Sequence, residues 1–304
     1  MRCFLGIDGG GTKTKALLCD EQLNTVSCFT GEGINFNAIG MKKARENLKN
    51  VCDAVLENED IELLSVFIGS AALSCRAESE LVREFCGGII NCDNITLDSD
   101  VYIGLMSMKA EGTRCMAVCG TGSMAAGIMP DGRILTCGGW GHLLGDEGSG
   151  YAICVDAVKA AIAYAEGYGN KTALYRAVLD YFNIRNIWEL IDVFYSERFS
   201  KSLIAGFAEE FFSCVKTKDL EAVRIMNGNA ESFAKTVCAL LKKMPDSAPL
   251  GLWGGIFQYH PEFLNAFSGF IKNEFPKTEI ALIDYPPEYG AVMAAREVYY
   301  DKAY

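Results

Sequence analysis

The sequence has few histidines, no long apolar run and no cluster of basic residues, and each shortage excludes a class of function. Two histidines among 304 residues, with no partner ligand nearby, argue against an imidazole metal site. Lysine and arginine total 28 against 39 acidic residues, which gives a net charge of -11. We therefore expect neither nucleic acid nor an anionic membrane as a partner.

Apolar runs stay well below the roughly 20 residues that span a bilayer. The first apolar stretch, in "MRCFLGIDGG", is also too short for a signal peptide. These features predict a cytoplasmic protein.

Cysteine is abundant, at 13 residues, but no CxxC spacing occurs. Most cysteines lie in apolar segments such as "ALLCD" and "YAICVD", where a thiol behaves as a small hydrophobe. Cys115 and Cys119 flank the alternating run "CMAVC", which places both on one face of a strand. We expect reduced core residues rather than disulfides or a metal site.

The chain contains the same pattern twice. Residues 2–33 alternate apolar segments with polar turns, which predicts strands joined by hairpins, and residues 114–137 repeat this order. Helical periodicity follows from Ile39 to Val55 in the first half and dominates residues 149–243 in the second. The repeat predicts a duplicated β-β-β-α-β-α unit, hence an α/β fold with mixed sheets.

The predicted domains are residues 1–112 and 113–287, the second with a helical insert. The closing helix, 288–304, is expected to pack back on the first domain. Because no low-complexity linker occurs, we expect a short hinge between the domains.

The first glycine turn lies in "GIDGGGTKT". Gly6 and Gly11 have Walker A spacing, but Thr12 replaces the lysine, and the following "KTKALLCD" alternates like a strand. A hairpin turn is therefore predicted, whose backbone N–H groups can still cradle phosphate. Asp8 would hold Mg²⁺, directly or through water, while the turn contacts the polyphosphate; its residues are Gly10, Gly11, Thr12 and Lys13. The alternative is a glycine hairpin with an exposed aspartate.

A second hairpin turn, "GTGS", offers two glycines and two hydroxyls, which suits a second contact to the same nucleotide; its residues are Gly120, Thr121, Gly122 and Ser123.

The segment "CGGWGHLLGDEGSGY", residues 137–151, holds six glycines in fifteen positions, which predicts a loop leading into a helix at Ser149. Asp146, Glu147 and Ser149 precede that helix and are candidates either for ligand contacts or for helix caps. Between the two acids, Glu147 is the better capping candidate. His142 is expected to order the loop by hydrogen bonding.

"TLDSD" places two carboxylates at a strand end before a helix. Asp98 and Asp100 compete for the role of general base. The alternative is that Asp100 merely caps the following helix.

In this order, "GIDGGGTKT", "GINFNAIG", "LDSD", "GTGS" and "CGGWGHLLGDEGSGY" resemble the N-acetylglucosamine kinases of the BadF/BadG-type ATPase family, within the actin-like and hexokinase-like superfamily. The resemblance covers essentially the whole chain. It implies two ribonuclease-H-like domains that close on Mg-ATP and an amino sugar, in a homodimeric kinase.

Carried over by motif, the resemblance makes Asp100 the base that accepts the sugar hydroxyl proton. Thr12, Lys13 and Thr121 would reach the phosphates, and Gly254 and Gly255 would lie near the adenosine. The sugar contacts implied are Asn35, Gly139, Trp140, Asp146 and Gly150.

Three alternatives remain. ATPase activators of acyl-CoA dehydratases or reductases in the same family need interface cysteines for an iron–sulfur cluster, which the scattered cysteines here do not provide. A non-catalytic sugar sensor would not need the complete set of acids and hairpins. Within the kinase hypothesis, N-acetylglucosamine is the first choice, with glucosamine and N-acetylmuramic acid open.

Overall fold

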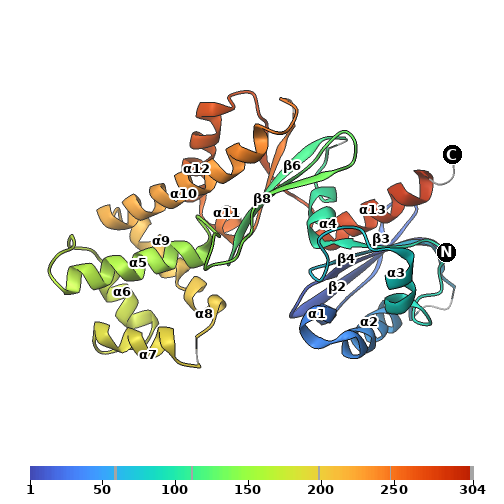
Figure 1. Ribbon diagram of the computed structural model, residues 1–304, viewed down its shortest axis with the longest axis horizontal. Coiled ribbons are helices and arrows are strands. Elements are labelled where there is room, and N and C mark those ends of the chain that lie inside the picture. Colours follow the sequence, from blue (N-terminus) through green and yellow to red (C-terminus); the bar gives the residue numbers. More distant parts are fainter. Residues whose placement is uncertain (58–59, 111, 198, 247, 302–304) are drawn as a thin grey trace. The chain divides into compact units, whose positions relative to one another are not determined.

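The computed structural model describes residues 1–57, 60–110, 112–197, 199–246 and 248–301. The chain divides into two units (Figure 1): Met1–Lys109 together with the segment from Ile283 onward, and Ala110–Leu282. Each unit is built on its own five-stranded sheet.

The first sheet has the order β3-β2-β1-β4-β5. β1 and β2 form an antiparallel hairpin, and β2 pairs antiparallel with β3, whereas β4 and β5 add to β1 in parallel. The sheet is therefore mixed, as the hairpins predict. Its strands are β1 (Arg2–Gly9), β2 (Lys13–Asp20), β3 (Thr25–Glu32), β4 (Glu62–Ser70) and β5 (Ile95–Ser99).

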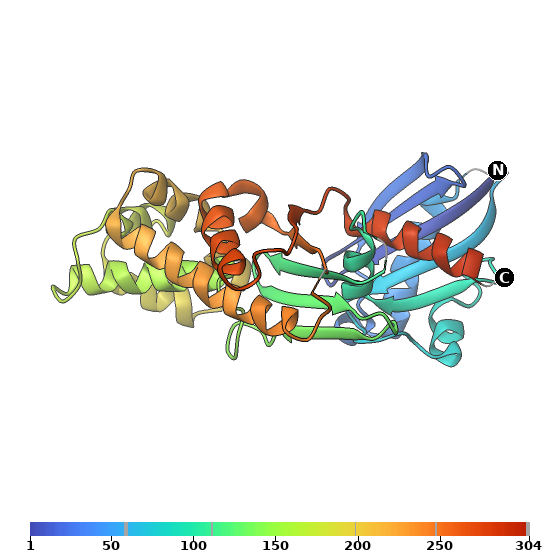
Figure 2. The same ribbon diagram turned by 90° about the horizontal axis from the view of Figure 1, so that it is seen from above.

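Alternation along β1 distributes its side chains between two helical layers. Leu5 and Ile7 join the core beneath α2 (Met41–Val55) and α3 (Ser79–Cys86). On the opposite face, Phe4 meets Tyr299 of α13 (Pro287–Asp301), which packs on β1, β4 and α4 (Asp100–Met106). Figure 2 shows α13 in red beside these strands.

The helix expected from Ile39 onward is interrupted at its start. α1 (Phe36–Ile39) ends at Gly40, and α2 begins at Met41. Gly40 has a φ of 80°, a left-handed conformation that separates the two helices.

The second sheet repeats the topology, with the order β10-β9-β6-β7-β8. β6 forms a hairpin with β7, β7 pairs antiparallel with β8, and β9 and β10 add in parallel. The predicted duplication is confirmed. The strands are β6 (Arg114–Cys119), β7 (Ser123–Ile128), β8 (Ile134–Gly138), β9 (Leu250–Trp253) and β10 (Ile280–Leu282).

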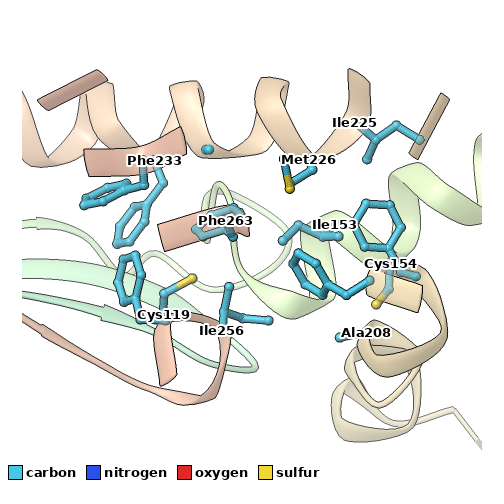
Figure 3. Close-up of a cluster of buried hydrophobic side chains, with 14 of the residues drawn as sticks. Cys119, Ile153, Cys154, Ala208, Ile225, Met226, Phe233, Ile256 and Phe263 are labelled. Atoms are coloured by element: carbon cyan, nitrogen blue, oxygen red, sulfur yellow. The ribbon is translucent and has the colours of Figure 1, made fainter. Parts of the chain in front are cut away.

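Helices between β8 and β9 enlarge the second unit and bury much of its core. Figure 3 shows Met226 and Phe233 of α10 gathered with Ile153 of α5 and Phe263 of α12. The helices are α5 (Gly150–Ala165), α6 (Leu174–Tyr181), α7 (Leu190–Tyr195), α8 (Lys201–Ala205), α9 (Ala208–Lys216), α10 (Leu220–Leu241), α11 (Gly255–Tyr259) and α12 (Pro261–Glu274), with a 3-10 turn at Ile187–Glu189.

All 13 cysteines are free, and nine are buried. Burial raises the pKa of the Cys115 thiol to about 12, so this thiol packs as a neutral apolar group. The expectation of core cysteines is wrong for Cys28 and Cys75, which are exposed. In the part of the chain that the structure describes, no helix has the length and apolar character to cross a membrane.

Gly6 allows α13 to approach β1 closely. A Cβ at this position would lie 2.4 Å from the backbone nitrogen of Val292 and 2.5 Å from the carbonyl oxygen of Glu288. Backbone atoms of a packed helix cannot yield as a flexible side chain would. The strand therefore needs glycine here for the closing helix to dock.

We predict that Gly6→Ala lowers the free energy of unfolding by about 1–3 kcal/mol or more, because the added methyl group overlaps the α13 backbone. Denaturant unfolding measures this loss. The control is Gly269→Ala on α12, where an added Cβ meets nothing within 4 Å; this variant should be neutral or slightly more stable. Equal stability of the Gly6 and Gly269 variants would contradict the prediction.

Candidate active site

The first glycine turn is the hairpin that the sequence predicts. Asp8 lies opposite Lys15 in the β1–β2 register, and the Gly10 N–H donates to the Lys13 carbonyl oxygen across the turn at 3.1 Å. Gly11, Thr12 and Lys13 are exposed at its tip. No helix follows, so the Walker A interpretation is excluded by the geometry.

The "GINFN" segment is fastened to this turn. The Ile34 N–H donates to the Gly10 carbonyl oxygen at 3.2 Å, and a Cβ on Gly33 would lie 2.3 Å from the Gly11 carbonyl oxygen. Asn35, next but one, caps α1 by accepting from the Asn37 N–H at 3.0 Å. Because Gly33 and Ile34 contact the first turn, Asn35, the next residue, lies near that turn in space.

Ser99 rather than Asp100 caps α4. The Ser99 hydroxyl accepts from the Tyr102 N–H at 3.2 Å, and Asp100 is the first helical residue. Asp98 is buried and pairs with Arg76, whose Nε lies 3.3 Å from Oδ2. Asp98 is thereby committed to an ion pair, while burial raises the pKa of the partly buried Asp100 carboxyl.

Asp8 shares its surroundings with two further carboxylates. Burial, and then the charges of Glu288 and Asp100, raise the pKa of Asp8 to about 6, although Lys15 and Lys13 oppose the shift. The parallel strands β1 and β5 end at one edge of the sheet, which explains why Asp8 and Asp100 are neighbours.

Glu288 is a member of this group that the sequence interpretation missed. Its Oε1 accepts from Lys15 Nζ at 3.1 Å, and its Oε2 is buried with no hydrogen-bond partner. Glu288 lies in the first turn of α13, 280 positions from Asp8, and no local motif marks it. Only the return of α13 to the first sheet brings it here.

These residues fit a magnesium ion held mostly by water and phosphate. Among the described residues, no group of three or more His, Cys, Asp or Glu side chains could hold a metal ion. Mg²⁺ commonly keeps several waters and takes only one or two carboxylates, and the excess negative charge around Asp8 suits a divalent cation.

The second glycine turn is tied to the start of α5. Gly150 donates its N–H to the Gly120 carbonyl oxygen at 2.8 Å, and the Ser123 hydroxyl donates to the Glu147 carbonyl oxygen at 2.7 Å. Thr121 is exposed at the tip. The structure therefore unites two predicted groups, the "GTGS" turn and the end of the glycine-rich loop.

Asp146 is buried in a left-handed conformation, with a φ of 64°. Its Oδ2 lies 3.2 Å from Lys201 Nζ and would be 2.9 Å from a Cβ on Gly122. Gly122 therefore leaves the room that this carboxylate occupies. Lys201 was not predicted, because α8 is distant in sequence and carries no recognisable motif.

The capping expectation for Glu147 is wrong. Ser149 caps α5 by accepting from the Ala152 N–H at 3.2 Å, while Glu147 is exposed. For His142, where the sequence predicts a hydrogen bond, the structure shows an edge-to-face aromatic contact with Tyr151, with ring centroids 4.9 Å apart. Short hydroxyl side chains reach the first-turn N–H groups better than a glutamate two residues earlier.

The middle of this loop presents apolar side chains to solvent. Trp140, Leu143 and Leu144 are 75%, 84% and 79% exposed. Gly139, beside Trp140, is also exposed, with a φ of 74°. The loop nevertheless folds back on itself beside Asp146, because a Cβ on Gly145 would lie 3.3 Å from Cβ of Trp140.

A cavity of about 380 Å³ opens beside the second turn. It is lined by the predicted residues Gly120, Thr121, Gly150 and Gly255. The other lining residues, from α8, α9 and α11 and from the positions directly after α8 and α11, were not predicted: Ser202, Ala205, Gly206, Ala208, Glu209, Ile256, Tyr259 and His260. Gly254 does not line it. A Cβ on Gly254 would lie 2.3 Å from the Cys119 carbonyl oxygen, so this glycine lets the β9–α11 turn pack on β6.

Two mixed sheets of the same topology, each with a glycine hairpin, define a two-domain actin-like ATPase fold. The chain belongs to the BadF/BadG/BcrA/BcrD ATPase family, whose model matches residues 5–295.

Two curated relatives span nearly the whole chain. An N-acetylmuramic acid/N-acetylglucosamine kinase from Clostridium acetobutylicum is 27% identical over 97% of this chain and 99% of its own. An N-acetyl-D-glucosamine kinase from Dictyostelium discoideum is 26% identical over 96% and 97%. A solved structure of a protein from Chromobacterium violaceum shares the fold, with a TM-score of 0.73 at 21% identity over 96% of this chain and 98% of its own.

The raised pKa of Asp8 predicts a pH-dependent cost of folding. Because the folded-state pKa, about 6, exceeds the ordinary 3.8, the folded state binds the proton more tightly. The stabilisation by this proton is complete below the ordinary pKa and is lost as the pH rises through about 6. Asp8→Asn should therefore be more stable than the wild type at pH 8, by on the order of 2 kcal/mol.

Denaturant unfolding without magnesium or nucleotide measures this gain, which should narrow as the pH falls from about 6 toward about 4. Asp53→Asn, at an exposed position of α2, should show no comparable gain at pH 8. A gain for Asp8→Asn that is constant with pH would contradict the assignment.

Proposed function

We propose that this protein transfers the γ-phosphoryl group of ATP to the 6-hydroxyl of N-acetylglucosamine. The chain is an ATP-dependent sugar kinase, and the proposal adds the acceptor and the residues that act. The proposal rests on the different contacts of Asp98, Ser99 and Asp100 at the end of β5. Asp98 is neutralised by Arg76 and Ser99 caps the helix, which leaves Asp100 for chemistry.

Asp100 is suited to act as the general base. Burial raises its pKa, which makes the carboxylate a better proton acceptor than an exposed aspartate. The proton would pass from the sugar hydroxyl to Asp100 as that oxygen attacks the phosphoryl group. Phosphoryl transfer otherwise requires alignment and charge neutralisation, because the protein forms no covalent intermediate.

The phosphates are assigned to the two hairpin turns. In the first turn, which begins at Gly10, Gly11 and Thr12 are exposed backbone at the tip and Lys13 supplies a cation. In the Gly120–Ser123 turn, Thr121 offers an exposed hydroxyl, whereas the Ser123 hydroxyl is already donated to Glu147. Mg²⁺, when bound, would neutralise phosphate charge, and Asp8 would hold it directly or through water. The cavity beside Thr121 and Gly255 is assigned to the nucleoside because it adjoins the second turn.

Sugar contacts are assigned to Asn35, Asp146 and Gly150, and to Gly139 and Trp140; Gly150 also lines the cavity assigned to the nucleoside. Asp146 combines burial with a left-handed backbone, a costly arrangement typical of functional positions. N-acetylmuramic acid is the second candidate, because the Clostridium acetobutylicum relative is named for both sugars. The proposal also includes a homodimeric protein located in the cytoplasm. Light scattering in solution tests the oligomeric state.

Asp100→Asn should lower sugar phosphorylation by about 10²- to 10⁴-fold, because the amide cannot accept the proton. A coupled ADP-release assay over N-acetylglucosamine, N-acetylmuramic acid and glucosamine measures the rate and ranks the acceptors. Nucleotide affinity should remain near that of the wild type. Asp98→Asn is the matched control and should lose far less activity. Near-wild-type turnover of Asp100→Asn would exclude this role.

Ser202→Trp should weaken ATP binding by about tenfold or more, equivalent to at least about 1.4 kcal/mol, because the indole would fill the nucleoside cavity. Ser202 is an exposed residue of α8 that lines this cavity, so the fold should tolerate the change. Calorimetric titration with a non-hydrolysable ATP analogue measures it, and Ser202→Ala is the control. Unchanged affinity in the tryptophan variant would place the nucleoside elsewhere.

A further inference from the structure

Arg76 contacts two side chains that flank Asp100 in the sequence. It lies between β4 and α3, and its Nε is 3.3 Å from Oδ2 of Asp98. Its guanidinium carbon also lies 5.8 Å from the centre of the Tyr102 ring, a cation–π arrangement. Asp98 precedes Asp100 by two positions, and Tyr102 follows it by two.

Both partners of Arg76 are themselves anchored. Asp98 is 4% exposed, and its Oδ1 accepts from the Ser99 N–H at 2.7 Å. Tyr102 stacks on Phe67 of β4, with ring centres 5.2 Å apart and an interplanar angle of 14°. The strand-to-helix turn that carries Asp100 is therefore anchored on both sides, at Asp98 and at Tyr102. Arg76 contacts both of these anchoring residues.

The two ends of the Arg76–Asp98 pair differ in exposure, at 54% for the Arg76 side chain and 5% for Asp98. An exposed cation contributes little to overall stability. A buried carboxylate that loses its cation, however, must find another partner, take up a proton or move. Loss of Arg76 should thus disturb the turn around Asp100 more than it destabilises the fold.

We propose that Arg76 is a positioning residue, which fixes Asp100 by holding Asp98 and Tyr102 on either side of it. The inference rests on the proposed role of Asp100 as the base. A base must lie within hydrogen-bond reach of the proton that it accepts, and a displacement of about 1 Å can cost about 10²-fold in rate. Arg76 itself touches no reacting atom in this assignment.

Steady-state kinetics of Arg76→Ala test the proposal. We expect kcat to fall by about 10- to 100-fold, while KM for ATP and for the sugar changes by less than about twofold. Arg76→Lys should recover part of the loss, because it restores the cation beside Asp98. Arg83→Ala is the matched control, since Arg83 lines the same cavity of about 460 Å³ as Arg76; it should retain wild-type kcat.

Two double variants distinguish positioning from a general structural effect. In an Asp100→Asn background, Arg76→Ala should cause no further loss, because the base through which it acts is already absent. Arg76→Ala combined with Asp98→Asn should be no slower than the slower of the two single variants. Arg76→Gln, which keeps the length and polarity of the side chain, replaces the alanine variant if that variant unfolds.

The proposal is overturned if Arg76→Ala matches Arg83→Ala, or if it causes the same fold loss with and without Asp100. These outcomes leave the kinase assignment intact if Asp100→Asn alone is inactive. An active Asp100→Asn enzyme would instead reject the proposed base itself.

Discussion

Poorly compensated negative charge at the carboxyl edge of the first sheet is the constraint on which the rest of the site depends. Asp8, Asp100 and Glu288 come from β1, α4 and α13, and burial raises the pKa values of Asp8 and Asp100. Lys15 balances part of this charge by pairing with Glu288. Bringing such carboxylates together is unfavourable unless a cation or a proton joins them, and the proposed Mg-nucleotide would supply that cation.

The second unit has the same topology as the first, but its hairpin turn lacks the charged residues of the first turn. One step before the hairpin turn, Asp8 pairs with Lys15 in the first sheet, whereas Val118 pairs with Met124 in the second. The second turn adds hydroxyls and glycines but no carboxylate of its own. Duplication of the fold thus gives one charged and one nearly neutral turn, as expected if the first carries the metal and the second mainly phosphate and nucleoside contacts.

Close backbone approach explains many of the glycines. Gly6 packs against the backbone of α13, Gly33 against that of the first turn, and Gly254 against that of β6. An added Cβ at each position would lie within about 2.5 Å of a backbone atom, so only glycine allows these contacts. The glycine-rich segments of this chain therefore serve packing as well as ligand binding. Local pattern located the turns, but it did not reveal which glycines face a ligand and which face another strand or helix.

Both hairpins, the duplicated mixed sheets and the segments that carry Asp8, Asp100 and Asp146 can be predicted from the sequence, because short-range alternation and glycine spacing specify them. Three features become visible only in the folded chain: Asp98 pairs with Arg76, Ser149 rather than Glu147 caps α5, and Glu288 and Lys201 lie beside carboxylates that are distant in sequence. These pairs form because helices that are distant in sequence pack beside the sheets and turns. No local residue pattern specifies such packing.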